Sequence, residues 1–428
     1  MTFQDKKIFY GWYIVVASTI GICFGYVGSV VYVFSSFIMP ISDEFGWGRG
    51  DISFGLIISN VIMVVVVPTV GILIDKKGVK NILLPSTIGF GIALCSFYFL
   101  TDNIWYFYSI IAILTIFGGA TASISYVRLI MTWFDQKKGL ALGLGLSGAG
   151  LSAMFLPSLV HKVIDAAGWR EAFVTLGAIN LLVVVPIIYF FMYNQPSDKG
   201  QLPDGRDIVE TDEAASSVRE IYQRGYTVQE ALRTSYFWKL LVGTTLFGAI
   251  LTGAVTQLIP LLVDVGLTRG EAVKMASFLG ISLISSRILA GYLLDRYHAP
   301  FVSAGFLLLP VIGFASVALM PNNITAFMAT VGLGAGLGLE FDVIGFFCVQ
   351  YFGRPVLGRM YSFLFVGFGL GGGLGSFFAG RSYDLTSSYQ TALLMASAVA
   401  LVGIIVIATL GRYPELPDHH KDEDVKDA

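Results

Sequence analysis

The sequence predicts an all-α membrane protein of twelve transmembrane helices, arranged as two pseudo-symmetric bundles of six. Three observations support this fold class. Of the 428 residues, 55% are hydrophobic and only 13% are charged, about half the charged fraction that covers a soluble domain. Twelve apolar runs of about 20 residues or more are long enough to cross a bilayer. The polar segments that end these runs also repeat along the chain.

The apolar runs lack the strict alternation of apolar and polar residues that barrel strands show, and mean hydropathy is +0.74. The first run follows a short polar lead without a small-residue cleavage site, so we expect a retained helix and not a signal peptide. The runs comprise residues 13–38, 52–74, 81–100, 104–131, 139–163, 170–192, 237–263, 272–294, 301–320, 324–350, 357–380 and 390–410.

One long polar stretch divides the runs into two sets of six. We expect an N-terminal bundle at 1–192, a cytoplasmic linker at 193–236, a C-terminal bundle at 237–413 and a disordered cytoplasmic tail at 414–428. Within the linker, Thr227 and Glu230 have the spacing of a capping box, which predicts a short helix before the seventh run.

Lysine and arginine gather in the short loops of one side, after the second, fourth, eighth and tenth runs. By the positive-inside rule these loops and both termini are cytoplasmic, in a bacterial-type inner membrane. Net charge is −2, so the sequence favours no nucleic-acid partner. Cys23, Cys95 and Cys348 all fall within runs and suggest neither a disulfide nor a metal site. We expect no cofactor, a lipid bilayer as surroundings, and a monomer.

The two halves repeat. The segment GILIDKKGVK (71–80) follows the second run, and GYLLDRYHAP (291–300) follows the eighth. The interval from Gly71 to Gly291 equals the interval from Asp75 to Asp295, so the two segments align without a gap. A duplicated helical membrane protein indicates a transporter whose site lies near the midplane, between the halves.

The segment 71–80 resembles the signature loop of the Major Facilitator Superfamily. Within that superfamily the chain is similar to the branch of monocarboxylate transporters and oxalate–formate antiporters. This likeness is carried by the helix of Arg287 and by FYGWYIVVAS (9–18), PISDEFGWGRGDIS (40–53), TVQEALRTSYFW (227–238) and IPLLVDVGLT (259–268). The resemblance implies the twelve-helix fold of this superfamily and the transport of a small organic anion.

The signature loop and its repeat predict an inner gate. Carboxylates at the ends of helices can bond to backbone donors or pair with basic residues, and breaking such pairs lets two halves rock. The alternative is that these residues only set the topology. The candidate gate residues are Asp75, Lys76, Arg128, Asp295 and Arg296.

A charge at the centre of a membrane helix costs about 2.5–3.5 kcal/mol and needs a reason. The candidates among the charged residues of the apolar runs are Arg128, Arg287, Glu340 and Asp342. Arg287 lies eight residues, or about 12 Å, before Asp295. A guanidinium stays charged when desolvated and binds a carboxylate with two hydrogen bonds. The resemblance places the substrate-binding arginine of the antiporter branch at Arg287. The alternative is a structural ion pair.

Glu340 and Asp342 lie at a depth similar to that of Arg287, about 16 and 13 Å inside the tenth run. Residues two apart on a helix point in different directions, so one carboxylate faces the cavity and the sequence does not say which. Either could release Arg287 to a substrate and take up a proton, or hold two helices together as a static pair.

The resemblance adds Asp264 as a candidate. Related carriers have a coupling aspartate in the seventh helix and an arginine in the eighth, and the interval between those two residues equals the interval from Asp264 to Arg287. The capping-box spacing of Thr268 and Glu271 instead places Asp264 near the outer mouth. Arg128 lies near the inner third of its run, where snorkelling to the cytoplasm is easy, which favours a gate or structural role.

Other residues are candidates for the cavity wall. Tyr26, Tyr126 and Gln257 offer directional hydrogen bonds, although aromatic residues in spans more often serve packing. Phe368 stands where the antiporter branch has a second cation, a lysine. One cation fewer favours a substrate with a single carboxylate and an apolar body.

The sequence therefore predicts a secondary transporter that moves a monocarboxylate with a proton by alternating access. The alternatives are an organic-anion exchanger, a carrier of a larger carboxylate, and a sensor that binds without transport. An enzyme is not expected, because the four histidines lie at span ends or in the tail, without acid or cysteine at ligand spacing.

Overall fold

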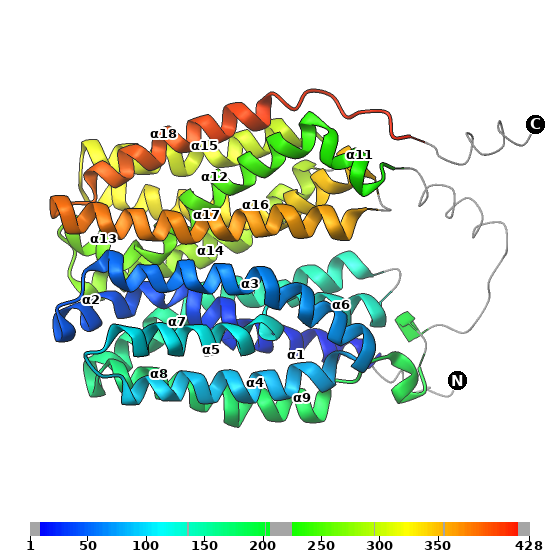
Figure 1. Cartoon of the computed structure of the whole chain (residues 1–428), viewed down its shortest axis with the longest axis horizontal. Helices are drawn as coiled ribbons and strands as arrows, with labels where there is room; N and C mark the ends of the chain where they lie inside the picture. Colours follow the sequence, from blue (N-terminus) through cyan, green and yellow to red (C-terminus); the bar gives the residue numbers. More distant parts are fainter. Residues whose placement is uncertain are drawn as a thin grey trace, which may run out of the picture. The chain divides into compact units, whose positions relative to one another are not determined.

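The computed structural model describes residues 9–134, 137–201, 203–205, 225–294, 296–353 and 356–417, without the side chains of Asp75, Lys138, Glu340, Phe341 and Asp342. These residues are helical almost throughout (Figure 1). The α-helices are α1 (Gly11–Phe24), α2 (Phe34–Phe45), α3 (Arg49–Lys77), α4 (Val79–Ser96), α5 (Ile104–Thr121), α6 (Ser123–Trp133), α7 (Lys138–Ala167), α8 (Trp169–Ile179), α9 (Val185–Phe191), α11 (Val228–Arg233), α12 (Ser235–Thr256), α13 (Leu258–Asp264), α14 (Arg269–Leu294), α15 (Ala299–Leu319), α16 (Asn323–Phe352), α17 (Leu357–Thr386) and α18 (Gln390–Ala408). Shorter pieces are the π-helices η1 (Val27–Tyr32) and η3 (Asn180–Val184) and the 3₁₀ turns η2 (Phe97–Phe99), η4 (Pro196–Lys199) and η5 (Pro203–Gly205).

Among the described residues, eleven helical segments are long and apolar enough to cross a membrane. Helix α16 supplies the twelfth, because its two parts, Asn323–Leu339 and Val343–Phe352, are inclined by 40° and together pass the same test. The prediction of an all-helical fold with about twelve spans is therefore confirmed.

The helices group into two compact units that cut across one helix. Unit 1 comprises Met1–Trp47 and Val61–Ile208, and unit 2 comprises Gly48–Asn60 and Val209–Ala428. The first turns of α3 thus belong to unit 2 and the remainder of α3 to unit 1.

Unit 1 is built around α1, which packs on α7, and around α4, which packs on α5 and α8.

The carboxylate of Glu44, near the end of α2, contacts the first residues of α8. It lies 2.7 Å from the Arg170 guanidinium and accepts a hydrogen bond from the Trp169 indole. The hydrogen bond from Arg170 is the main reason that the pKa of Glu44 falls below its usual value.

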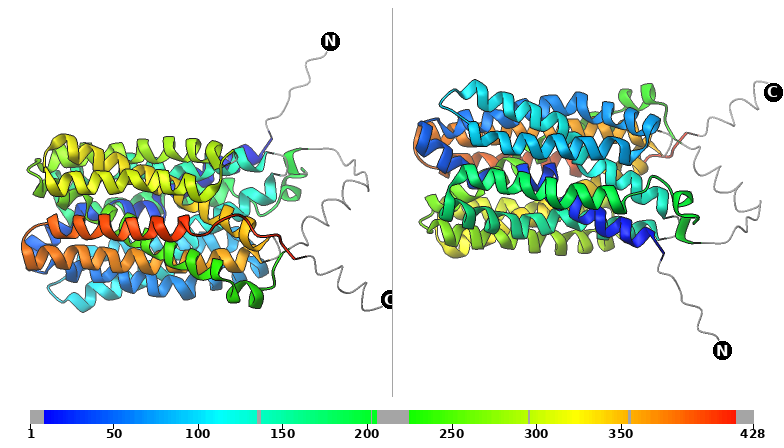
Figure 2. Two further views of the ribbon diagram at one scale, coloured as in Figure 1. Left: turned by 90° about the horizontal axis from the view of Figure 1, so that it is seen from above. Right: turned by 90° about the horizontal axis from the view of Figure 1, so that it is seen from below.

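In unit 2 the helices lie side by side in all three views (Figures 1 and 2). Helix α12 packs on α17, and α16 packs on both α14 and α15. Glycines allow the first contact, because a methyl group at Gly371 or Gly375 of α17 would run into the α12 carbonyls of Thr245 and Ala249. The glycine run of α17 thus packs against a helix of its own unit.

The short helix predicted in the linker is present as α11, and its capping box is confirmed. The Thr227 amide donates to the Glu230 carboxylate at 2.8 Å, and the Glu230 amide donates back to the Thr227 hydroxyl at 3.3 Å. The second predicted capping box, between Thr268 and Glu271, opens α14 in the same way.

Candidate functional site

Arg287 lies half-buried on α14, where this helix crosses α16. Small residues bring the two backbones together. A methyl group at Gly338 of α16 would lie 3.1 Å from the Arg287 amide nitrogen and 2.5 Å from the Leu283 carbonyl oxygen. The Ser282 hydroxyl, on the α14 side, donates to the Val331 carbonyl of α16 at 2.6 Å. The sequence therefore fixes the backbone of Arg287 against the middle of α16.

Helix α16 bends directly after this contact. The bend of 40° separates Leu339 from Val343, and both predicted coupling carboxylates, Glu340 and Asp342, fall within it. Gly338 precedes Glu340 by two residues, about 3 Å along a helix. The backbones that carry Arg287 and the two carboxylates thus come together at one crossing inside unit 2. The side chains of Glu340 and Asp342 lie outside the described part of the structure.

The bend in α16 has a counterpart in unit 1. Helices α5 and α6 are separated at Ala122, whose backbone is extended, and the interval from Ala122 to Glu340 is close to that between the two signature segments. Helix α1 ends beside the same place, at Gly25, and the next amide, that of Tyr26, donates to the Thr121 hydroxyl at 3.1 Å. Interrupted helices at equivalent positions of two repeats are typical of substrate sites in transporters.

Tyr26 and Tyr126 lie in the core of unit 1. Tyr26 is 8% exposed, and its ring packs where a side chain at Gly118 would stand. Tyr126 is fully buried, and its hydroxyl reaches Gly21 of α1. Within the described part of the chain this hydroxyl has no hydrogen-bond partner, which leaves one donor of unit 1 available.

Gln257 stands between α12 and α13 and is 1% exposed. Both ends of its amide are engaged. The amide nitrogen donates to the Ser53 hydroxyl of α3 at 2.7 Å, and the amide oxygen accepts from the Tyr389 hydroxyl at 2.8 Å. Burial raises the pKa of the Tyr389 phenol far above its usual value, so Tyr389 is a neutral donor.

Tyr389 connects Gln257 to the start of α3. Its hydroxyl also accepts from the Arg49 guanidinium at 3.1 Å, and that guanidinium stacks on the Tyr383 ring at 3.6 Å. The Asp384 carboxylate accepts from the amides of Arg49 and Gly50 at 2.9 and 2.8 Å, so α17 caps the N-terminus of α3. We call Arg49, Ser53, Gln257, Asp384 and Tyr389 the Gln257 network.

Replacing Gln257 by Leu is expected to lower the stability of the protein by about 2 kcal/mol or more, because the buried hydroxyls of Ser53 and Tyr389 lose a partner. The measurement is the thermal unfolding midpoint in detergent, with Gln390→Leu as the exposed control. If Gln257 contacts substrate instead, the midpoint stays and only stabilisation by ligands is lost.

Asp264 ends α13 and is exposed. Its carboxylate accepts a long hydrogen bond, 3.4 Å, from the Tyr389 amide, next to the Gln257 network. Arg269 is the first residue of α14, and Arg287 lies about 27 Å farther along that helix. Asp264 is thus close to the Gln257 network, whereas Glu340 and Asp342 are close to the Arg287 backbone.

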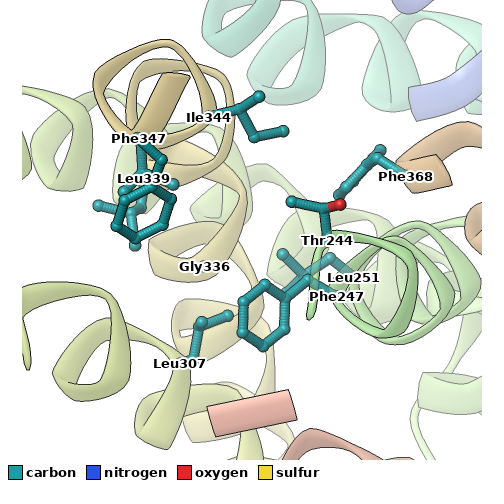
Figure 3. Close-up of a pocket in the computed structure, with 10 residues that line it drawn as sticks. Thr244, Phe247, Leu251, Leu307, Gly336, Leu339, Ile344, Phe347 and Phe368 are labelled. Carbon is teal, nitrogen blue, oxygen red and sulfur yellow. The ribbon is translucent and has the colours of Figure 1, made fainter. Parts of the chain in front are cut away.

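Phe368 of α17 lines a small apolar cavity inside unit 2 (Figure 3). Figure 3 shows Phe368 on the same side as Phe247 of α12, with Leu339 and Phe347 of α16 opposite. Thr244 brings a hydroxyl, but this hydroxyl donates to backbone carbonyls of its own helix. The remaining lining residues are Leu251, Leu307, Gly336, Val343 and Ile344. The cavity therefore suits an apolar group, and it shares a turn of α16 with the Arg287 crossing.

The predicted gate residues lie at helix ends or on exposed faces. Lys76 is exposed in the last turn of α3, and Arg128 is exposed on α6. Arg296 is exposed with its guanidinium 4.0 Å from the Tyr292 ring. Asp295 and the side chain of Asp75 lie outside the described residues. Groups of three or more His, Cys, Asp or Glu that could hold a metal ion are absent from the described residues.

Sequence reasoning missed the Gln257 network as a unit. Ser53 and Gln257 are 204 residues apart, and Gln257 and Tyr389 are 132 apart, so local patterning carried no sign of their contact. The available signal was the pair of glycines around Arg49. A methyl group at Gly48 or Gly50 would lie 2.8 or 3.0 Å from the Asp384 carboxylate, so these glycines permit its approach.

Comparison with known proteins gives the family. Residues 18–355 match the Major Facilitator Superfamily. Over 417 residues the chain is 25% identical to the oxalate:formate antiporter of Oxalobacter formigenes, covering 94% of this chain and 92% of the relative. It is 24% identical to human monocarboxylate transporter 12 over 348 residues, covering 71% and 62% of the two chains.

Solved structures agree in fold. The nucleoside transporter NupG matches with a TM-score of 0.70 at 14% identity, covering 95% of this chain and 100% of NupG. At this identity the match speaks for the fold alone. The family match, the duplicated signature loop and the helical spans together show that this chain belongs to the Major Facilitator Superfamily and is a multi-pass membrane transporter, not an enzyme.

Proposed function

We propose that this transporter moves a small monocarboxylate together with a proton by alternating access. The observation that carries the proposal is the crossing of α14 and α16, where Gly338 brings the Arg287 backbone next to the bend that contains Glu340 and Asp342. A cation and two carboxylates on touching helices, deep in the apolar part of the chain, are expensive unless they serve a ligand or a proton.

The proposed mechanism is an exchange of partners at Arg287. Without substrate, Arg287 is paired with a resident carboxylate, which stays ionised. The substrate carboxylate displaces that acid and takes both hydrogen bonds of the guanidinium. The displaced acid, Glu340 or Asp342, loses its counter-charge in an apolar setting and binds a proton there. Substrate and proton are then carried together, and Asp264 is the weaker candidate for this role.

The relatives support an organic anion as substrate, since the names of two of them specify oxalate, formate and monocarboxylates. Phe368 and the apolar cavity beside α16 support a ligand with an apolar body. The proposed inner gate consists of Asp75, Lys76, Arg128, Asp295 and Arg296, and the cytoplasmic face is the face with the lysine-rich loops.

The proton role is tested with Glu340→Gln and Asp342→Asn in proteoliposomes that carry a pH gradient. We expect one of the two variants to exchange labelled acid across the membrane but to lose accumulation driven by the gradient, because the neutral amide cannot carry a proton. The wild type should alkalinise the medium as labelled acid enters. If both variants accumulate acid fully, neither residue carries the proton.

The same vesicles separate symport from exchange, the mode that the name of the oxalate:formate relative favours. An exchanger takes up labelled acid only when an anion is present inside, and it leaves the external pH unchanged. A larger carboxylate as substrate is recognised when uptake of labelled acid is inhibited more strongly by benzoate than by lactate.

A further inference from the structure

Two lysines of unit 1 converge on one aromatic ring. The ammonium of Lys80, in the first turn of α4, lies 4.9 Å from the centroid of the Tyr193 ring. The ammonium of Lys199, the last residue of η4, lies 4.1 Å from the same centroid. The two like charges are therefore within roughly 9 Å of each other, an arrangement that attracts an anion.

Hydrogen bonds hold Lys80 and the backbone of Tyr193 in place, and Lys199 contacts the rings of Tyr10 and Tyr193. Lys80 donates to the Tyr189 carbonyl at 2.6 Å, and the Asn194 side chain accepts from the Lys80 amide at 2.9 Å. The Tyr193 carbonyl accepts from the Trp133 indole at 3.0 Å, which holds the shared ring in place. Between residues 9 and 205, as far as the structure describes them, neither lysine forms an ion pair with a carboxylate.

An exposed apolar strip leads up to the lysines. Helix α4 packs against η3 and α9, and the outer faces of these segments are apolar. On α4 the strip contains Ile88 and Ile92, and on η3 and α9 it contains Leu182, Val183, Tyr189, Phe190 and Phe191. From Lys80 to Ile92 is about 18 Å along the helix, close to the depth of one leaflet of a core about 30 Å thick.

We propose that Lys80, Lys199 and Tyr193 form a binding site for the phosphate headgroup of an anionic phospholipid, whose acyl chains lie along the strip of α4 and α9. An ammonium is a good partner for phosphate, and lysines at the membrane surface are attracted to anionic lipid. The strip favours a lipid over a free anion, because only a lipid covers the apolar residues as well as the charges. The inference is independent of the transported substrate.

The test is lipid titration of the full-length purified protein in detergent micelles, followed by thermal unfolding. We expect dioleoylphosphatidylglycerol to raise the unfolding midpoint more than dioleoylphosphatidylcholine does. The double variant Lys80→Gln/Lys199→Gln should lose this preference, with an apparent affinity for phosphatidylglycerol lowered about tenfold or more. Lys80→Arg/Lys199→Arg should retain it.

Lys239→Gln is the matched control, since Lys239 of α12 also donates to a backbone carbonyl, that of Thr409 at 2.8 Å. It should keep the full preference for phosphatidylglycerol. The exposed single variant Lys199→Gln serves if the double variant does not fold, and it should weaken the preference in part. Two outcomes would overturn the proposal: an unchanged preference in the lysine-to-glutamine variants, or equal stabilisation by glycerol 3-phosphate, which has the headgroup charge but no acyl chains.

Discussion

Replacing Arg287 by Gln is expected to weaken ligand binding by roughly 100-fold while the protein remains folded. In a thermal-shift series of short acids from lactate to benzoate, the wild type should be stabilised by its ligands and the variant should not. A paired guanidinium–carboxylate bond contributes about 1.5–3 kcal/mol or more when desolvated, so affinity should fall by roughly 100-fold. Arg287 is half-buried beside Gly338, so loss of the charge leaves the packing of α14 on α16 in place.

Two further variants sharpen the result. Arg287→Lys keeps the charge but cannot form two parallel hydrogen bonds, and it should bind the same acids more weakly than the wild type. Arg412→Gln removes an exposed arginine beyond α18 and should leave every shift unchanged. Acids that still stabilise Arg287→Gln as strongly as the wild type would show that the anion site lies elsewhere.

Substituting Gly371 by Ala should lower the stability of the protein by about 3 kcal/mol or more. An exposed helical glycine gains stability of up to about 1 kcal/mol from this change, so the two effects have opposite signs. Packing decides here, because the new methyl group would collide with the Thr245 carbonyl of α12, a backbone atom that cannot turn aside. The whole contact of α12 with α17 would have to widen.

The control for this experiment is Gly305→Ala on α15, where the new methyl group meets no atom within 4 Å. The measurement is the thermal unfolding midpoint of both variants and of the wild type in the same detergent, which shows whether the methyl group at Gly371 lowers the stability of the protein. We expect Gly305→Ala to unfold at the wild-type temperature or slightly above it. A Gly371→Ala protein as stable as the wild type would mean that α12 and α17 are farther apart than the structure has them.

The sequence predicted the fold because membrane spans are encoded locally. Long apolar runs identify the membrane spans without any knowledge of contacts. The same locality explains why the sequence alone makes Arg287, Glu340 and Asp342 candidates, since a charge within an apolar run is conspicuous. The capping boxes at Thr227 and Thr268 were predictable for the same reason, because each lies within four residues.

Contacts between distant segments could not be predicted in this way. The hydrogen bonds of Gln257 were not predicted, because its partners, Ser53 and Tyr389, are far away along the chain. In the sequence, Lys80 is only one of the lysines that mark the cytoplasmic side. That Lys80 and Lys199 both contact the Tyr193 ring could be seen only in the folded structure. The break between α5 and α6 could not be predicted either, because it falls at Ala122 and alanine favours a continuous helix.

The capped start of α3 bears on how the protein can be divided. A chain cut in the linker separates residues 1–192 from 237–413, which matches the internal sequence repeat but not the two compact units. The second fragment would then lack Arg49 and Ser53. The side chains that bond to these two residues, those of Gln257, Asp384 and Tyr389, would lose their partners. The first turns of α3 are therefore part of the interior of unit 2, although they precede the linker in the chain.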